Sequence, residues 1–324
     1  MNRSQIANLL VKSNAFAPFR FLNRAKLPIL MYHRFSGNEE FGKTSRQTFE
    51  EHLSYLSRHY KIIRLTDAVE RFQRGTKLPN RSVVITIDDG YKDFYEIAFP
   101  VLQKFNVPAT IYLVTDFVNE NCWIWTDKAR YVLCRTKMER LDIEICGTKF
   151  DQALGGPDSR LILAGALNTE LKRLSDEDKD ARIAGLAKAL KVDIPDRPTE
   201  GYRAFGWDDA RKMAAAGIEV GSHTATHPIL TNVASSRLES ELRIAKSAIE
   251  GNLEKSAAHF CYPNGNASKR ERDAADAAGY ASAVTTEIRL CENGDDRFML
   301  PRIDAEPEIH RFVQSTSGFD RLKG

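Results

Sequence analysis

The sequence has few cysteines, and their spacing suggests neither disulfide pairs nor a metal-binding pair. Five cysteines are spread over 324 residues without a C-x-x-C spacing. An odd, scattered set favours neither a disulfide framework nor a cysteine-ligated zinc site, so we expect a reducing compartment. The formal net charge is only +3, and no basic cluster dominates. We therefore expect no nucleic-acid partner, because proteins that bind nucleic acid usually concentrate their cations on one face.

The amino-terminal segment lacks acidic residues and also lacks a continuous apolar run. Residues 1–26 carry five lysines or arginines and no Asp or Glu. No stretch is long enough for a signal peptide or a spanning helix, so we expect a cytoplasmic protein. Apolar residues interspersed with these cations make residues 1–26 a basic amphipathic leader. Such a leader either packs on the domain or makes peripheral contact with an anionic membrane.

The rest of the chain alternates between short apolar runs and segments with apolar residues at helical spacing. Runs such as VVITI at residues 83–87 predict buried strands. Their repetition predicts a parallel sheet with helices outside it, either doubly wound or closed into a barrel. The alternation covers residues 27–118 and 202–310. The charged composition of residues 119–201 predicts a mostly helical insertion. We expect residues 311–324 to form a C-terminal tail.

Two polar motifs directly follow predicted strands. Asp88 and Asp89 come after VVITI, and His223 and His227 come after the run IEVG. Parallel barrels carry their functional residues at the carboxyl ends of strands, so we expect these four side chains to meet. Two imidazoles and one carboxylate can ligate a divalent ion with open positions. The second carboxylate then stays free to act as a base.

These motifs resemble those of a known family. TIDDG at residues 86–90 and HTATHP at residues 223–228 resemble the first and second motifs of the polysaccharide deacetylases, the NodB-homology or carbohydrate esterase family four enzymes. The resemblance is to the exopolysaccharide and poly-N-acetylglucosamine deacetylase subgroup. It implies a distorted (β/α)7 barrel of the NodB-homology type, here with a helical insertion.

The resemblance also implies a reaction and a set of roles. The expected enzyme is a metal-dependent hydrolase that removes an N-acetyl or similar acyl group from an amino sugar in a polysaccharide or glycan precursor. Its partner is therefore a carbohydrate that carries an N-acetylated sugar. Asp88 would be the general base, and Asp89, His223 and His227 would hold a divalent metal. That metal would be zinc, with cobalt or nickel as alternatives.

The third motif departs from the family pattern at two positions. FCYPNG at residues 260–265 has Cys261 where the family has an arginine that orients the base, and Asn264 where it has an aromatic residue. Arg302 in LPRI is the candidate replacement, because a similar arginine follows in the exopolysaccharide subgroup. A backbone N–H at Asn264 can still stabilise the oxyanion, since that contact needs no particular side chain.

The general acid and the sugar-binding residues are further candidates. His33 in MYHRF resembles the Tyr-His of the poly-N-acetylglucosamine deacetylases, and a pKa of about 6.5 suits proton donation to a leaving amine. The alternative is a histidine that packs at a strand end. Tyr91 and Tyr262 adjoin the motifs and are candidates for stacking on a sugar, with core packing as the alternative.

Two other functions stay open on the sequence alone. A catalytically inactive carbohydrate-binding protein on the same fold would account for the missing third-motif arginine. An amidohydrolase or deformylase acting on an amide outside polysaccharides would use the same motifs. The presence of Asp88 argues against the binding protein, because carbohydrate binding does not require a free base beside the ligand.

Overall fold

Seven parallel strands close into a barrel in the computed structural model, which describes residues 11, 13–38, 40–42 and 44–319. Strand β1 (Ile29–Tyr32) pairs with β3 (Ser82–Ile87) on one side and with β10 (Leu300–Asp304) on the other. The ring continues through β4 (Thr110–Leu113), β7 (Glu219–Ser222), β8 (His259–Cys261) and β9 (Ser282–Ile288). A short strand, β2 (Lys61–Ile62), pairs with β3 outside the ring. The predicted (β/α)7 barrel is confirmed.

The alternation of side chains along β3 shows how the barrel positions its chemistry. Val83, Ile85 and Ile87 pack in the core between the strands and the outer helices. Val84 packs in a second core inside the ring. Because side chains alternate between the two faces of a strand, Thr86 shares the inner face with Val84. The next residue on that face is Asp88, which therefore emerges at the carboxyl end of the barrel.

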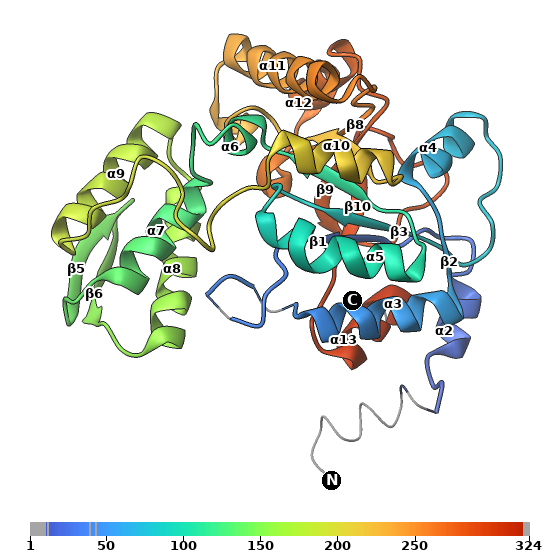
Figure 1. Cartoon of the computed structure of the whole chain (residues 1–324), viewed down its shortest axis with the longest axis horizontal. Coiled ribbons are helices and arrows are strands. Elements are labelled where there is room, and N and C mark those ends of the chain that lie inside the picture. Colours follow the sequence, from blue (N-terminus) through green and yellow to red (C-terminus); the bar gives the residue numbers. More distant parts are fainter. Residues whose placement is uncertain (1–10, 12, 39, 43, 320–324) are drawn as a thin grey trace.

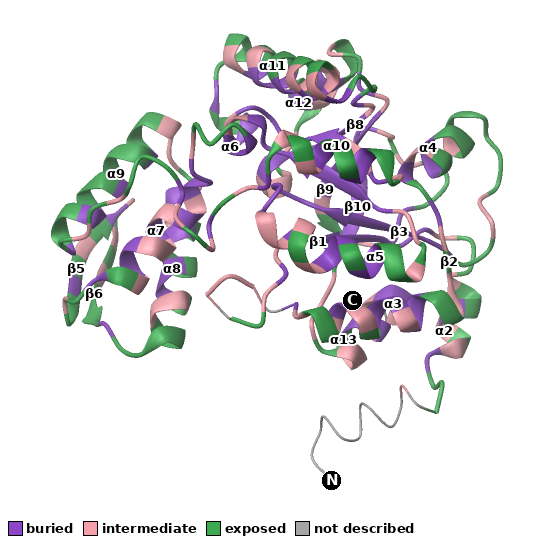
Figure 2. Cartoon of the chain, in the orientation of Figure 1, coloured by how far each residue is buried: buried purple, intermediate pink, exposed green. Residues whose placement is uncertain are grey.

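Helices surround the barrel and bury one face each against it (Figures 1 and 2). Phe49 in α3 and Leu102 in α5 belong to the outer core, the one that contains Val83, Ile85 and Ile87 of β3. A π-helical turn at Phe94–Ala98 leads into α5, and 3-10 turns occupy Leu230–Asn232 and Pro263–Gly265. The outer helices are α3 (Arg46–His59), α4 (Leu65–Gln73), α5 (Phe99–Phe105), α6 (Thr115–Val118), α10 (Trp207–Ala215), α11 (Ser235–Leu253), α12 (Lys269–Ala277) and α13 (Ile309–Ser317).

Residues 119–201 form a separate lobe beside the barrel (Figure 1). The lobe contains α7 (Trp125–Arg135), α8 (Pro157–Leu171) and α9 (Asp176–Ala189) around its own hydrophobic core. The expectation of a mostly helical segment is wrong for its middle, where β5 (Arg140–Ile145) and β6 (Thr148–Ala153) form an antiparallel hairpin. Leu141, Ile143 and Ile145 alternate with polar residues, and this spacing of two favours a strand over a helix.

The first and last described helices pack against the barrel. Helix α2 (Ala17–Leu22) follows the buried Phe16, and Arg20 Nη1 donates to the Tyr55 hydroxyl at 2.9 Å. Residues 1–10 and 12 of the predicted leader lie outside the described residues. Phe312 and Val313 of α13 pack in the main core, so packing continues past residue 310. Within the described ranges, no helix combines the length and apolar character needed to cross a membrane.

Candidate active site

Three side chains from two strand ends converge at the carboxyl end of the barrel. Asp89 follows β3, whereas His223 and His227 follow β7. Asp89 Oδ1 lies 3.5 Å from His223 Nε2 and 3.5 Å from His227 Nε2. All three residues are buried. The ring places only β4 between β3 and β7, so side chains that are distant in the sequence become neighbours.

The donor atoms of this trio suit a divalent cation. His223 Nδ1 donates to the Cys261 carbonyl at 2.7 Å, so Nε2 carries the lone pair on the side of Asp89. Burial lowers the pKa of His223 to about 4 and that of His227 well below its usual value. Both imidazoles are therefore neutral, which is the form that ligates a metal. One carboxylate oxygen and two imidazole nitrogens match a zinc-type site with open positions.

Asp89 itself has a buried atom without a protein partner. Its Oδ1 accepts no hydrogen bond from any described residue. Burial, followed by the charges of Asp88 and Asp127, raises the pKa of Asp89 well above its ordinary value. A carboxylate in such surroundings stays ionised when a cation is bound beside it. The trio therefore fits the divalent metal expected from the sequence.

The loop that carries the two histidines is held by a residue that the motifs do not reveal. Thr224 and His227 have left-handed backbones, with φ of 70° and 63°. The buried Glu241 of α11 accepts hydrogen bonds from the Ala225 and Thr226 amides, each at 2.9 Å, and from the Thr226 hydroxyl. A signal for Glu241 does exist in the sequence, because it interrupts an apolar helical stripe that includes Leu238, Leu242 and Ala245.

Asp88 lies beside the trio in a buried ion pair with Arg302. Arg302 Nη1 and Nη2 donate to Asp88 Oδ1 and Oδ2, each at 2.7 Å. Arg302 also donates to the Thr285 carbonyl and the Thr86 hydroxyl, and its side chain is fully buried. Burial alone would raise the pKa of Asp88, but the Arg302 guanidinium outweighs it and holds that pKa well below its ordinary value. Asp88 is therefore ionised at neutral pH.

His33 lies on the solvent side of this ion pair. It follows β1, and its Nε2 is 3.7 Å from Asp88 Oδ2. The His33 side chain is 47% exposed, whereas that of Asp88 is 2% exposed. A small cavity of about 330 Å³ adjoins His33 and Arg34. The structure thus gives His33 access both to Asp88 and to a molecule entering from solvent.

The comparisons with known proteins identify the family. The family model described as polysaccharide deacetylase matches residues 75–283, which span Asp88, Asp89, His223 and His227. The chain belongs to the polysaccharide deacetylase family. The resemblance noted from the motifs is thereby confirmed.

Two relatives support this assignment, one over most of the chain and one over a short segment. The Bacillus subtilis (strain 168) protein YxkH is 22% identical over 284 residues, covering 87% of this chain and 72% of that protein. The poly-β-1,6-N-acetyl-D-glucosamine N-deacetylase of Staphylococcus epidermidis is 36% identical over 86 residues, which is 26% of this chain and 29% of that enzyme.

Solved structures of deacetylases share the fold. Streptococcus pyogenes deacetylase PplD superposes with a TM-score of 0.61 at 16% identity, covering 90% of this chain and 98% of that one. IcaB from Ammonifex degensii also gives a TM-score of 0.61, at 17% identity, with coverages of 90% and 97%. At identities this low, the superpositions show a shared fold alone, and the substrate must be argued from the site.

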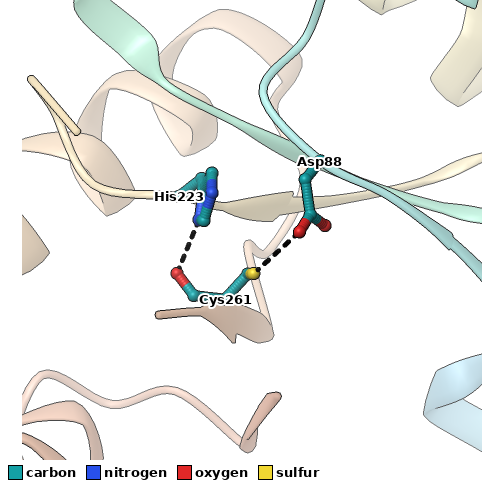
Figure 3. A group of neighbouring side chains, drawn as sticks. All are labelled: Asp88, His223 and Cys261. Atoms are coloured by element: carbon teal, nitrogen blue, oxygen red, sulfur yellow. Dashed lines mark hydrogen bonds between the residues drawn. The ribbon is translucent and has the colours of Figure 1, made fainter. Parts of the chain in front are cut away.

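Cys261 occupies the position where the motif resemblance predicts an arginine. The thiol donates to Asp88 Oδ2 at 3.4 Å, and the adjacent Cys261 carbonyl accepts from His223 (Figure 3). Arg302 Nη2 lies 3.2 Å from Cys261 Sγ. Burial raises the pKa of Cys261 well above its usual value, so the sulfur remains a neutral thiol. The guanidinium thus reaches Asp88 from β10 rather than from β8, and a small side chain at position 261 lies against it.

The two candidate tyrosines are buried, which departs from the expected stacking on a sugar. Tyr91 is 3% exposed, and its hydroxyl donates to Asp127 Oδ2 at 2.7 Å while the Arg34 guanidinium lies 3.9 Å from its ring centroid. Tyr262 has no exposed surface and contacts the ring of Phe260. Both rings belong to hydrophobic core clusters, Tyr91 with Phe117 and Tyr262 with Phe260.

Asn264 lies in the 3-10 turn after β8. Its backbone is left-handed, with φ of 59°, and its carbonyl accepts from the Thr286 hydroxyl at 3.1 Å. Gly265 donates to the Tyr262 carbonyl at 2.8 Å, which closes the turn. The role of the Asn264 amide at the oxyanion stays a prediction.

Proposed function

We propose that this protein is a metal-dependent hydrolase that removes an N-acetyl group from an amino sugar in a polysaccharide or glycan precursor. The observation that carries the proposal is an ionised, buried carboxylate, Asp88, directly beside a three-ligand site for a divalent cation. Membership of the polysaccharide deacetylase family supports the reaction. The local match to a poly-β-1,6-N-acetyl-D-glucosamine N-deacetylase supports an N-acetylated sugar as substrate.

The residues divide the chemistry among them. Asp89, His223 and His227 would hold a zinc, cobalt or nickel ion, which when bound would polarise the amide carbonyl and increase the acidity of water. Asp88 then accepts a proton from the attacking water. Arg302 keeps Asp88 ionised and fixes the direction of its carboxylate through two hydrogen bonds. A depressed pKa makes Asp88 a weak base, so the water that it deprotonates must already be acidic.

The leaving amine needs a proton, and His33 is the proposed donor. Its imidazole lies on the open side of Asp88, where a sugar nitrogen can approach. Replacing His33 with alanine should lower kcat and leave metal binding unchanged. His59→Ala is the matched control, because His59 ends α3 just before β2 and so lies at the opposite end of the barrel. Equal kcat for the two variants would remove His33 from the mechanism.

The reaction is tested by acetate release from N-acetylglucosamine oligomers with zinc or cobalt added. We expect Asp88→Asn to abolish release while binding the metal as tightly as the wild-type protein, since Asp88 is not a ligand. Asp89→Asn should lose both metal binding and release. Tight metal binding without acetate release by the wild-type protein would exclude these oligomers as substrates. Release that survives Asp88→Asn would refute the proposed base.

A further inference from the structure

A cluster of cations and exposed apolar side chains lies at the end of the barrel opposite the site. Phe21 and Leu22 of α2 are 63% and 72% exposed, and few large apolar residues of the described chain are as open. The Arg24 guanidinium lies 4.2 Å from the Phe21 ring centroid. Two adjacent apolar side chains on a surface, with a cation beside them, suit the interface between water and lipid better than they suit water.

Three cations of this cluster are joined through the backbone. The Arg81 amide donates to the Arg24 carbonyl at 2.6 Å, and the Lys61 amide donates to the Arg81 carbonyl at 2.8 Å. All three side chains are exposed. The ion pairs found among the described residues include none of them. The adjacent Lys26, in contrast, pairs with Glu292 at 2.8 Å.

A fourth cation, Arg58, belongs to the same region. Arg58 lies in the last turn of α3, three residues before Lys61 at the start of β2. Arg58 at the end of α3 is exposed and also has no ion pair among the described residues. We call the set Phe21, Leu22, Arg24, Arg58, Lys61 and Arg81 the basic patch.

The topology sets the orientation of the basic patch relative to the catalytic residues. Arg24 precedes β1 and Arg81 precedes β3, whereas His33 and Asp88 follow those strands. A strand rises about 3.3 Å per residue, so Arg81 and Asp88 lie on the order of 20 Å apart along β3. A surface bound at the basic patch would therefore leave the catalytic end facing away from it.

We propose that the basic patch docks this protein on an anionic phospholipid surface. The cations are attracted to the negative surface potential, and Phe21 and Leu22 enter the boundary between headgroups and acyl chains. Charge complementarity decides between possible occupants. A symmetric interface with a second copy would bring Arg24, Lys61 and Arg81 against the same cations, and like charges repel. The docked enzyme would act on glycan that extends away from the membrane.

Sedimentation of the full-length protein with vesicles tests the proposal. We expect binding to phosphatidylcholine vesicles that contain phosphatidylserine, no binding to phosphatidylcholine alone, and weaker binding in high salt. Removing Lys61 and Arg81 together by substitution with glutamine should weaken binding about 25-fold, at about five-fold per cation. Phe21→Ser with Leu22→Ser should also weaken it.

Two controls match these changes. Ile162→Ser removes a side chain that is 74% exposed on α8, and Arg182→Gln with Lys188→Gln removes two exposed cations from α9. Both should bind vesicles like the wild-type protein, and thermal unfolding of every variant should show that it folds. Equal binding by patch and control variants, or binding without phosphatidylserine, would overturn the proposal. So would patch variants that change only the sedimentation coefficient of the free protein, because the patch would then be a protein interface. Acetate release in solution should not change, so this test is independent of the proposed reaction.

Discussion

Replacing Arg302 with methionine should destabilise the protein strongly, because it leaves the Asp88 charge buried without its partner. Arg302 has no exposed surface and Asp88 is 2% exposed, so water cannot replace the two hydrogen bonds of 2.7 Å. Removing one partner of a buried ion pair costs about 3–5 kcal/mol. The thiol of Cys261 remains, but it is a weak donor and offsets little of this loss.

The pH dependence of this loss has a definite sign. In the wild-type protein the pKa of Asp88 lies below its unfolded value of about 3.9, so the stabilisation is complete above that pH and is lost as the pH falls below it. In the Arg302→Met variant, burial without the guanidinium raises the pKa of Asp88. The variant therefore gains stability as the pH falls from neutrality towards that raised pKa. The difference between the two proteins should be largest at neutral pH and should shrink on acidification.

Urea unfolding of the metal-free proteins near neutral pH and at mildly acidic pH measures this difference. Asp88→Asn and the double variant complete a cycle that isolates the coupling between the two side chains. We expect Arg302→Met to cost much less when Asn occupies position 88, because no buried charge is then left unpaired. A loss below about 1 kcal/mol, or an equal loss in both backgrounds, would refute the reasoning, since buried ion pairs couple more strongly than this.

Three further measurements test the site and its support. Glu241→Gln should weaken zinc binding about 10- to 100-fold, as measured by calorimetry. The reason is that the histidine loop loses the carboxylate that accepts hydrogen bonds from its backbone amides. Unchanged affinity would show that Glu241 does not support the metal site. Zinc at 100 times its Kd should raise the free energy of unfolding by about 2.7 kcal/mol, and Asp89→Asn should remove that gain. Tyr91→Phe should cost about 1–3 kcal/mol in urea unfolding by leaving the buried Asp127 short of a donor. A smaller effect would indicate that water reaches Asp127.

The sequence alone determined the class of fold and most of the chemistry. Alternating apolar runs and helical spacing predict parallel strands with outer helices, because each pattern reflects one local geometry. Asp88, Asp89, His223 and His227 follow strands, and the carboxyl ends of parallel strands lie at the same end of a barrel. Their convergence could therefore be expected without coordinates. The hairpin at residues 140–153 does show alternating apolar and polar residues in the sequence. The charged and largely helical segments on either side of it favoured a helical interpretation instead.

The tertiary structure decided what local patterns do not encode. Barrel closure places β10 beside β1, and this brings Arg302 to Asp88 across a separation of 214 residues. The same closure accounts for the departure at Cys261, since the guanidinium arrives from a different strand. Glu241 and the burial of Tyr91 likewise depend on which faces meet when α11 and the insertion pack on the barrel. Periodicity specifies that a face is buried, but the partner of that face is fixed only when distant segments come together in three dimensions.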